Sequence, residues 1–409
     1  MRSAATIEVA PKSRPSLIAP DAINRCRTRV VAVTAEPHLE SHDGAITVAI
    51  DVGPLLGPLT GIGVAVQQMV ATLHESPRVA LAPYACSFRG AMPHGTTRLP
   101  VPAAIAQRLW GRLSGPRMDH WLRPAQVIHG TNYVVPPSRL PRVVSVYDCW
   151  FLRQPTHASG DVVRAGRVLR RAVDGGATVH ASSHATADAV RELLHTDRVE
   201  VIPLAALPLP EQPIISIPPV AELEGVPFMV AIGTLETRKN LPRLVQAFGL
   251  IADAHSDLRL VLAGQDGDDR GATNTAIDRL PPTTRDRVMF TGRIDEAAKH
   301  WLLAHAIVLA YPSLDEGFGF PLLEAMAYDL PVVASTAGSI PEVAGDAALL
   351  VAAHDVHALA DALQLALTDS ATRTRLTDAG RRRIQHYSWA DTASQLAGLY
   401  RRLAQEGPR

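Results

Sequence analysis

The chain has 409 residues, of which 47% are hydrophobic and 20% charged, and its formal net charge is zero. A chain of this length is longer than one hydrophobic core ordinarily supports, so we predict two domains of roughly 150–200 residues each. The three cysteines, Cys26, Cys86 and Cys149, lack CxxC spacing. They argue against a disulfide framework or a structural zinc site and favour a reducing cytoplasm.

Residues 1–43 combine basic side chains with prolines and lack the apolar core of a signal peptide, so we predict a disordered tail there. The sequence also lacks an uninterrupted apolar run of ~18 residues, the length that a membrane-spanning helix requires. We therefore expect a cytoplasmic protein.

Apolar runs typical of strands alternate with helical patterns from residue 44 to 205, which indicates a parallel α/β domain. The first run, 46–51, predicts a strand, and 60–73 predicts an amphipathic helix after a glycine turn. Further strand and helix pairs are expected within 127–137, 141–148 and 177–194.

Prolines crowd residues 206–227 and predict a linker, because proline interrupts both helices and strand ladders. A second α/β series occupies 228–387, with strands expected at 228–235, 258–264, 287–293 and 306–312. Residues 388–409 hold a final helix with apolar residues at helical spacing. The predicted fold class is therefore α/β, with two doubly wound, Rossmann-like domains.

The segment 312–324, PSLDEGFGFPLLE, places Glu316 and Glu324 eight positions apart across a glycine-hinged loop that leads into a helix. Free N–H groups at a helix N-terminus favour a phosphate or diphosphate, and Glu324, which we place in the first turn, can reach a sugar hydroxyl. The alternative is one capping glutamate and one solvated glutamate.

This segment resembles the Glu-x7-Glu signature of retaining family-4 glycosyltransferases with the GT-B fold, and the likeness continues through 324–351. The resemblance implies two domains that face each other across a cleft. It places Glu316 near the transferred sugar and Glu324 on the ribose hydroxyls of the nucleotide. The donor-binding residues that it implies between them are Gly317, Phe318 and Gly319.

Arg238 and Lys239 are adjacent in 233–248 and precede an apolar-periodic helix that Asn240 can cap. By resemblance, this basic pair neutralises the departing nucleoside diphosphate, and Gly233 and Thr234 contact the donor. Many family members have an arginine where this chain has Thr234, which shifts the weight to Arg238. The alternative is a solvated basic surface.

The segment 290–306 has the spacing of the strand end that binds the nucleobase in this family. Its contacts, near Gly292, Arg293 and Ile294, are made by the backbone and leave the choice among guanine, uracil and adenine open.

Gly61 and Gly63 resemble the glycine loop that approaches the phosphate and sugar of the donor. They also match part of a dinucleotide fingerprint, but Val66 occupies the third glycine position. A nicotinamide oxidoreductase is therefore the weaker interpretation.

Tyr147 and Asp148 fall where the family has a histidine followed by an aspartate close to the donor sugar. A tyrosine can hydrogen-bond a sugar hydroxyl but is a poor base at neutral pH, so Tyr147 suits substrate positioning. The alternative is a tyrosine at the edge of the core beside a capping aspartate. His129 and the pair Ser182 and Ser183 also match positions near the cleft, or are satisfied structural groups.

Asp266, Asp268 and Asp269 lie together in a glycine-rich segment, where a solvated turn is a better interpretation than a metal site. No HExxH spacing occurs among the 16 histidines. We therefore expect neither a metal nor a cofactor beyond the nucleotide-sugar co-substrate.

Charge is divided unequally along the chain. Residues 44–205 contain 16 Arg and Lys against 10 Asp and Glu, whereas residues 206–409 contain 18 against 25. The basic first domain favours an anionic acceptor or peripheral contact with the inner face of an anionic membrane. Nucleic acid is not an expected partner, because no recognition motif accompanies the arginines.

Together these patterns predict a retaining enzyme that moves a hexose, such as mannose, from a nucleotide-diphosphate sugar to a hydroxyl of a glycan or lipid-linked acceptor. The alternative is a catalytically silent nucleotide-sugar sensor or assembly subunit of the same fold, which the tyrosine at position 147 keeps open.

Overall fold

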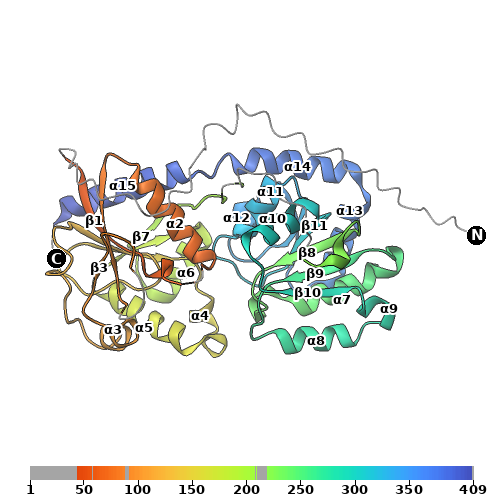
Figure 1. The fold of residues 1–409 in the computed structure, drawn as a ribbon, viewed down its shortest axis with the longest axis horizontal. Helices are drawn as coiled ribbons and strands as arrows, with labels where there is room; N and C mark the ends of the chain where they lie inside the picture. The colour runs from red at the N-terminus through yellow and green to blue at the C-terminus, as the bar shows by residue number, and fades with distance from the viewer. Residues whose placement is uncertain (1–43, 58, 88–91, 208, 210–218, 408–409) are drawn as a thin grey trace, which may run out of the picture.

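The computed structural model describes residues 44–57, 59–87, 92–207, 209 and 219–407, which form two lobes side by side (Figure 1). The predicted tail, 1–43, lies outside the described residues, as does most of 208–218 within the predicted linker. The short helix η4 (Ala221–Leu223) precedes the second lobe.

The N-terminal domain is built on a seven-stranded sheet in which all neighbouring strands pair in parallel, in the order β3-β2-β1-β4-β5-β6-β7. Its strands are β1 (Ile46–Asp51), β2 (Val79–Ala85), β3 (Thr97–Arg98), β4 (Val127–Gly130), β5 (Arg142–Val146), β6 (Thr178–Ala181) and β7 (Val199–Val201). The chain reverses its direction of winding between β1 and β4. Ligands bind at such a switch point in doubly wound sheets.

Helices cover both faces of this sheet. They are η2 (Gly53–Leu55), α2 (Gly61–His74), α3 (Ala103–Trp110), α4 (Trp150–Arg153), η3 (Pro155–His157), α5 (Gly160–Asp174) and α6 (His184–Leu194). Successive strand residues enter opposite layers, since side chains alternate along a strand. On β1, Val48 and Ile50 pack in the core cluster that holds α2, whereas Ala49 packs in the cluster that holds α3 and α5.

The C-terminal domain has a six-stranded parallel sheet in the order β10-β9-β8-β11-β12-β13, with its switch point between β8 and β11. The strands are β8 (Phe228–Ile232), β9 (Arg259–Ala263), β10 (Val288–Gly292), β11 (Val308–Tyr311), β12 (Val332–Ser335) and β13 (Ala348–Val351). The four strands expected from the sequence in this domain correspond to β8, β9, β10 and β11.

Two helical layers enclose this second sheet. One contains η5 (Thr237–Lys239), α7 (Leu241–Ile251), η6 (Ala252–Ala254), α8 (Arg270–Asp278), α9 (Pro282–Arg285) and α13 (Val356–Thr368). The other contains α10 (Glu296–His305), α11 (Phe320–Ala327), α12 (Ile340–Ala344) and α14 (Ser370–Ile384). On β8, Met229 packs with α7 while Val230 faces α10 and α11.

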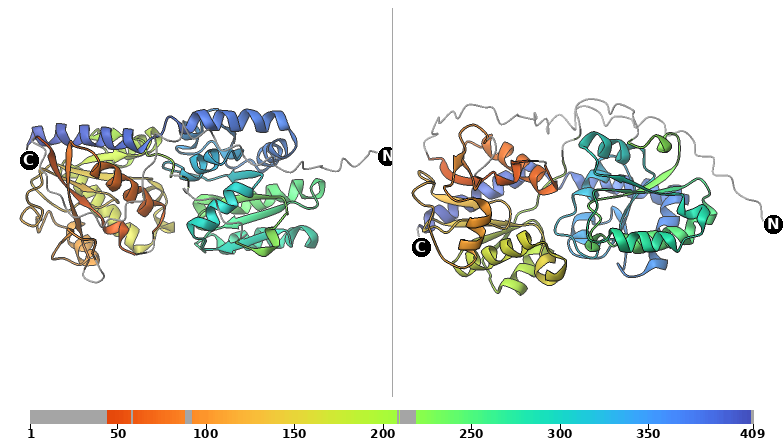
Figure 2. Two further views of the ribbon diagram at one scale, coloured as in Figure 1. Left: turned by 45° about the horizontal axis from the view of Figure 1, so that its top comes forward. Right: turned by 60° about the horizontal axis from the view of Figure 1, so that its bottom comes forward.

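The last helix, α15 (Trp389–Glu406), runs from the C-terminal domain along the N-terminal domain, as both views in Figure 2 show. It packs on α2, β1 and β4. The indole Nε1 of Trp389 donates to the carbonyl of Ala206 at 3.0 Å, and Thr392 Oγ1 donates to that of Pro203 at 2.7 Å. The helix therefore ties the end of the chain to the first domain.

A buried chain of hydrogen bonds fixes α15 to the N-terminal sheet. Tyr400 Oη lies 2.6 Å from His129 Nδ1, His129 Nε2 lies 2.8 Å from Ser145 Oγ, and Ser145 Oγ lies 2.8 Å from His180 Nδ1. His180 Nε2 lies 2.9 Å from the carbonyl of Ile202, which can only accept. One arrangement of hydrogens then satisfies every group with both imidazoles neutral. The structure thus gives His129 a structural role.

This network predicts that acid destabilises the protein. Burial lowers the pKa of His180 to about 4 from 6.5, and burial together with His180 lowers the pKa of His129. Because the unfolded chain binds more protons in this window, stability falls as pH falls from about 6.5 to about 4, by on the order of 3 kcal/mol for His180. Urea unfolding across this window measures the slope.

The matched variant is His180→Gln, which keeps a donor and an acceptor but does not titrate in this range. It should flatten the pH dependence whatever its effect on absolute stability. An equally steep dependence in this variant would show that other groups carry it.

No helix among the described residues is long and apolar enough to cross a membrane.

Candidate active site

The predicted donor residues meet at the switch point of the C-terminal sheet. Arg238 and Lys239 lie in η5, after β8, and Glu316 lies in the loop after β11. These two strands are neighbours, so their carboxyl ends bring the loops together although 77 residues separate Lys239 from Glu316. Parallel pairing therefore creates a cluster that sequence spacing does not reveal.

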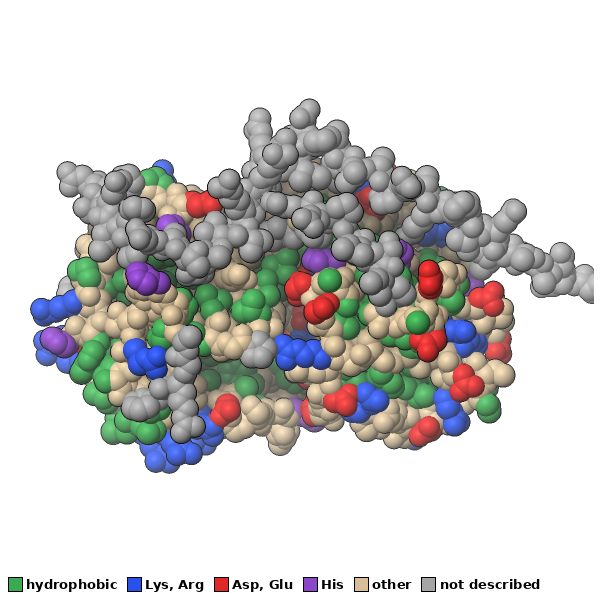
Figure 3. Space-filling model, in the orientation of Figure 1, with side chains coloured by type: hydrophobic (Ala, Val, Ile, Leu, Met, Phe, Trp, Pro, Cys, Tyr) green, Lys and Arg blue, Asp and Glu red, His purple; other side chains and the backbone are tan. Residues whose placement is uncertain are grey.

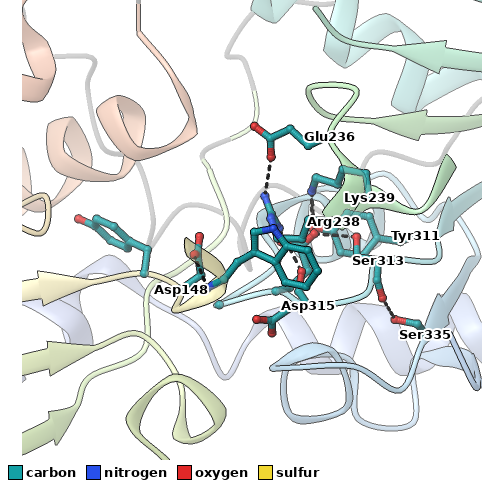
Figure 4. A network of polar contacts seen from close by, with 12 residues as sticks. Asp148, Glu236, Arg238, Lys239, Tyr311, Ser313, Asp315 and Ser335 are labelled. Carbon is teal, nitrogen blue, oxygen red and sulfur yellow. Dashed lines mark hydrogen bonds and ion pairs between the residues drawn. The ribbon is translucent and has the colours of Figure 1, made fainter. Parts of the chain in front are cut away.

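Glu316 is held between the two cations. Its Oε2 lies 2.5 Å from Arg238 Nη1 and its Oε1 lies 2.7 Å from Lys239 Nζ. Arg238 also donates to the carbonyl of Asp315 at 3.1 Å and reaches Glu236 Oε2 at 3.4 Å. Figure 4 shows Arg238 and Lys239 side by side, with Asp148 approaching from the first domain. The cluster is mostly buried, since only 8% of the Glu316 side chain is exposed.

Burial alone raises the pKa of Glu316, but Arg238 and Lys239 outweigh it and hold this pKa at about 2. Glu316 is therefore a carboxylate at neutral pH and a poor proton donor. Burial lowers the pKa of Lys239, and Glu316 opposes that effect. Glu316 and Glu236 both lie within ion-pair distance of Arg238, so two carboxylates balance the two cations of the cluster. Arg238 and Lys239 are the cationic groups that a diphosphate at this turn would meet.

Neighbouring residues hold this cluster in place. Ser313 Oγ donates to Glu316 Oε1 at 2.7 Å, and Lys239 Nζ donates to the hydroxyl of Tyr311 at 3.1 Å. Gly233 has a φ of +144°, and a Cβ there would lie 2.9 Å from Lys239 Cε. Glycine is thus required where the lysine side chain passes the strand end, while Thr234 follows it in the same turn.

Asn240 occupies the N-cap position of α7, but its side chain does not cap the helix, contrary to our expectation. Its backbone is left-handed, with a φ of +58°, and its Nδ2 donates to the carbonyls of Pro312 at 2.9 Å and Ala353 at 2.7 Å. The side chain therefore links three loops at the sheet edge.

The N-terminal domain contributes Asp148 to the cluster. Burial raises the pKa of this carboxyl group, Arg238 lowers it, and Glu316 raises it, with a net increase. Asp148 Oδ1 also accepts from the Trp150 N–H at 3.1 Å. The structure thus brings together four of the five predicted catalytic side chains: Glu316, Arg238, Lys239 and Asp148.

The fifth, Tyr147, points elsewhere. Its hydroxyl donates to the carbonyl of Thr131 at 2.8 Å, and 7% of the residue is exposed. Burial raises its pKa further, which removes it from acid–base chemistry near neutral pH. In this arrangement Tyr147 is a core residue and cannot donate to a sugar hydroxyl, which favours the alternative interpretation of this position.

Gly317 is a point of close contact between the two domains. A Cβ on this residue would clash with the carbonyl of Tyr147. Its own carbonyl accepts from the hydroxyls of Ser182 at 3.1 Å, Ser183 at 2.7 Å and Thr186 at 3.0 Å. Gly317 therefore meets the first domain through its backbone, and Ser182 and Ser183 are interdomain contacts.

A second contact reinforces this interface. The carboxylate of Glu342 accepts from the backbone N–H of His184 at 3.0 Å and of Ala185 at 3.2 Å, at the N-terminus of α6. A carboxylate at this position is favoured by the helix dipole. The C-terminal domain thus caps a helix of the N-terminal domain.

The side chain of Phe318 does not face the site. It is 4% exposed and packs edge-on against Phe320 and Tyr387. We expected a donor contact from this residue, and in this structure only its backbone is available for one. Gly319, with a φ of +93°, precedes the first residue of α11, where glycine allows the left-handed turn.

Glu324 lies one residue further along α11 than expected. The helix begins at Phe320, so Glu324 is its fifth residue rather than part of its first turn. Its Oε1 lies 2.8 Å from Lys299 Nζ, and that lysine also pairs with Glu296 at 2.8 Å. Glu324 is 7% exposed, so its carboxylate is mostly shielded from solvent and is held by this lysine.

The remaining predicted donor residues lie at element ends. Arg293 and Ile294 follow β10, the former exposed and the latter packed against the core. Gly61 and Gly63 fall within the first turn of α2 rather than in a preceding loop, and Thr60 caps this helix by accepting from the Gly63 N–H at 3.3 Å.

The three aspartates at 266–269 do not converge. Asp266 pairs with Arg270 at 2.5 Å, whereas Asp268 accepts from the hydroxyl of Thr237 at 3.0 Å and pairs with His157 of the other domain at 3.1 Å. Among the described residues, no group of three or more His, Cys, Asp or Glu side chains is arranged to hold a metal.

Sequence reasoning missed two charged residues near these sites. Lys299 was hidden because its partner Glu324 is 25 residues away on another helix. Asp51 ends β1 at the switch point of the N-terminal sheet, where burial raises its pKa to about 7. The sequence did offer a signal for Asp51, because it is a carboxylate at the end of the first strand of a doubly wound domain.

Comparisons with known proteins relate this chain to glycosyltransferases. Residues 216–383 match the family described as "Glycosyl transferases group 1". The O-antigen chain mannosyltransferase B of Escherichia coli is 28% identical over 377 residues, which cover 86% of this chain and 98% of that protein. The phosphatidyl-myo-inositol mannosyltransferase of Mycobacterium leprae is 32% identical over 177 residues, 42% of this chain and 46% of that protein.

Solved structures resemble both domains together. Sucrose-phosphate synthase from Thermosynechococcus elongatus superposes with a TM-score of 0.66 at 21% identity, covering 88% of this chain and all 100% of that one. WaaG, a glycosyltransferase involved in lipopolysaccharide biosynthesis, superposes with a TM-score of 0.63 at 16% identity, covering 87% of this chain and 99% of that one. At 16–21% identity, these similarities support the fold alone.

Proposed function

We propose that this chain, which belongs to the group 1 glycosyl transferases and has the GT-B fold, transfers a mannosyl residue from a nucleoside diphosphate sugar to an acceptor hydroxyl with retention of anomeric configuration. The observation that carries the proposal is the buried cluster of Glu316, Arg238 and Lys239, which faces Asp148 of the other domain. The fold class and enzyme class expected from the sequence are confirmed.

The choice of mannose rests on the relatives. The Escherichia coli relative, 98% of whose length is covered by the match, is an O-antigen chain mannosyltransferase. The Mycobacterium leprae relative is also a mannosyltransferase. A nucleoside diphosphate donor is supported by the two cations, Arg238 and Lys239, beside a helix start and by Glu324, whose carboxylate suits ribose hydroxyls.

In the proposed mechanism, the bond between the anomeric carbon and the diphosphate breaks and its electron pair leaves with the diphosphate. Arg238, Lys239 and the start of α11 stabilise the charge that develops there. The acceptor oxygen attacks from the same face, and its proton passes to the departing phosphate oxygen. Glu316, with a pKa of about 2, stays ionised and faces the positive charge that develops on the sugar ring.

The test is turnover of a panel of donors. We expect GDP-mannose or another nucleoside diphosphate mannose to be consumed when a mannose-containing glycan is present, and the matching nucleoside diphosphate to raise Tm. At 100 times its Kd, a ligand stabilises the folded state by about 2.7 kcal/mol. Binding without turnover for every donor and acceptor would favour a silent sensor or assembly subunit instead.

We further propose that transfer needs no divalent metal, because Arg238 and Lys239 already place positive charge where the diphosphate leaves. Activity should persist within about twofold after EDTA treatment in metal-free buffer. The matched variant is Asp268→Asn, which tests whether this carboxylate holds a metal. Asp268 is chosen because Thr237 and His157 hold it near the cleft. Loss of activity in EDTA and its recovery with magnesium or manganese would contradict the proposal.

The acceptor is proposed to be a glycan carried on a lipid, approached at the inner face of a membrane. Arg108, Arg112 and Arg117 are exposed on the N-terminal domain, and so are Ile105 and Leu113, at 48% and 55%. Figure 3 shows Lys and Arg side chains beside hydrophobic ones along the lower edge of this domain, below α3 and α5 in Figure 1. Basic and apolar groups together suit an anionic bilayer surface.

This membrane contact predicts binding to anionic liposomes at low salt that fades above roughly 0.3 M salt, since each arginine contributes about 1 kcal/mol at most and is screened. Replacing Arg108, Arg112 and Arg117 together with glutamate should abolish sedimentation with the liposomes. No sedimentation of the unchanged protein at low salt would contradict the contact.

A further inference from the structure

A cavity of about 330 Å³ lies at the switch point of the N-terminal sheet, where β1 and β4 end. Its wall includes Asp51 from the end of β1, Tyr84 from β2, Asn132 after β4, and Gln107 and Trp110 from α3. Doubly wound domains bind ligands at this place. The C-terminal domain uses its switch point for the Glu316 cluster, and no side chain of that cluster lines the N-terminal cavity.

Two residues that line this cavity each carry a buried polar atom without a partner among the described residues. Asn132 Oδ1 and the indole Nε1 of Trp110 are both buried and have no hydrogen-bond partner among the described residues. Asp51 Oδ1 accepts from the Gly53 N–H at 2.9 Å. Buried polar groups are rarely unsatisfied, and these two atoms are themselves shielded from the cavity. Hydroxyl groups of a ligand in the cavity would supply the missing partners if these side chains turn toward it.

The cavity is linked to the donor cluster through short contacts. Thr131 Oγ1 donates to the carbonyl of Asp51 at 2.7 Å, and the carbonyl of Thr131 accepts from Tyr147 at 2.8 Å. The carbonyl of Tyr147 in turn touches Gly317, the residue after Glu316. The cavity is therefore joined to the donor cluster by a short path of direct contacts.

A second hollow, of about 570 Å³, adjoins the first, and Gln107 lines both. Arg108 and Arg112 approach it from α3 and the turn after it, and Arg164 and Arg167 from α5. Arg164 pairs with the exposed Asp161, but none of the described residues that line the hollow is acidic. Four guanidinium groups around one concave site suit a phosphate group, which arginine binds with paired hydrogen bonds.

We propose that the two hollows form one acceptor site, in which the inner cavity holds a sugar through Asp51, Asn132 and Trp110 and the arginine hollow holds a phosphate group attached to that acceptor. The proposal rests on the proposed function and adds the chemical class of the acceptor, a phosphate-bearing saccharide. A soluble sugar phosphate and a saccharide on a lipid phosphate share this chemistry.

Asp51 is a positioning residue in this site, because its carboxylate can accept a hydrogen bond from an acceptor hydroxyl. The titratable side chains that face it are Tyr84, Cys86 and Tyr147, whose pKa values burial raises so that they stay neutral at neutral pH. Burial also raises the pKa of Asp51, to about 7. The KM for acceptor should therefore rise as pH falls below 7, and Asp51→Asn should remove this dependence.

The direct test is calorimetric titration of the whole protein with mannose 1-phosphate and with methyl mannoside. The double variant Arg112→Gln and Arg167→Gln should weaken sugar phosphate binding at least about tenfold and leave methyl mannoside binding unchanged. Both side chains are exposed, so folding should be preserved. The matched control replaces the exposed Arg78 and Arg139, which lie outside the hollow, with glutamine. Asn132→Ala should weaken both ligands.

A second arm presents a lipid-phosphate saccharide in detergent micelles and identifies which source of phosphate the site prefers. Binding of either phosphorylated ligand that the double variant weakens supports the proposal. If neither binds, or if the control pair weakens binding as strongly, the proposal is wrong. Donor turnover is measured separately, so sugar phosphate binding without turnover would overturn the proposed function and leave this site standing.

Discussion

Lys239→Met should lower kcat/KM by about 10²–10³-fold, because it removes an ammonium group held where the diphosphate leaves. The side chain is 12% exposed and reaches Glu316 at 2.7 Å, so water cannot readily replace its charge. Initial rates over a range of donor concentrations measure the effect. We expect most of the loss in kcat, since the charge on the leaving group is greatest in the transition state.

The matched control is Arg270→Met, which removes a cation of the same domain that pairs with exposed Asp266. It should leave kcat/KM within about twofold, since exposed ion pairs contribute little. Because Lys239→Met leaves Glu316 paired with Arg238 alone, its folding is checked by Tm. A well-folded Lys239→Met variant with normal kcat would contradict the assigned role of the lysine.

Glu324→Ala should weaken nucleoside diphosphate binding by about 1.5–3 kcal/mol, or roughly 10–150-fold, through loss of a charge-assisted hydrogen bond to the ribose. In the structure this carboxylate is paired with Lys299 at 2.8 Å, so ribose must share it with the lysine. Calorimetric titration with the diphosphate that raises Tm measures the change.

Glu296→Ala is the matched control for this prediction. It removes the other carboxylate that pairs with Lys299, also at 2.8 Å, but its side chain is 60% exposed. Affinity should change by no more than about threefold. Equal losses in the two variants would mean that Lys299 orientation, rather than a ribose contact by Glu324, determines affinity.

The sequence predicted four of the six strands of the C-terminal domain, β8 to β11, because both faces of its sheet are covered. Residues 258–264 and 306–312 are nearly continuous apolar runs, as buried parallel strands require. Gly317 and Gly319, together with Pro321, identified the loop, and they located the helix start to within one residue. From there the positions of Glu316 and of the basic pair followed by resemblance.

Ion pairs between residues far apart in the chain could not be predicted from the sequence. Nothing local to Arg238 or Lys239 shows that both side chains contact Glu316, since strand order rather than spacing brings β8 beside β11. The same holds for Lys299, which reaches Glu324 from a different helix. Position in a strand-to-helix turn predicted that a residue lies near the site, but it did not predict its partners.

Side-chain direction accounts for the other differences. Tyr147 and Phe318 lie next to true site residues in sequence, yet their rings enter the core. Residues adjacent on an extended or looping backbone point in opposite directions, and large aromatic side chains are drawn toward buried volume. Their family positions predicted the backbone location correctly and the role of the side chain less well.

The anomeric configuration of the product tests the central claim most directly. The protein is incubated with an α-linked nucleoside diphosphate mannose and a mannose-containing acceptor, and the new linkage is assigned by nuclear magnetic resonance. The account predicts an α-linked product that Lys239→Met forms far more slowly. A β-linked product, or binding of the donor with no product from any acceptor, would contradict it.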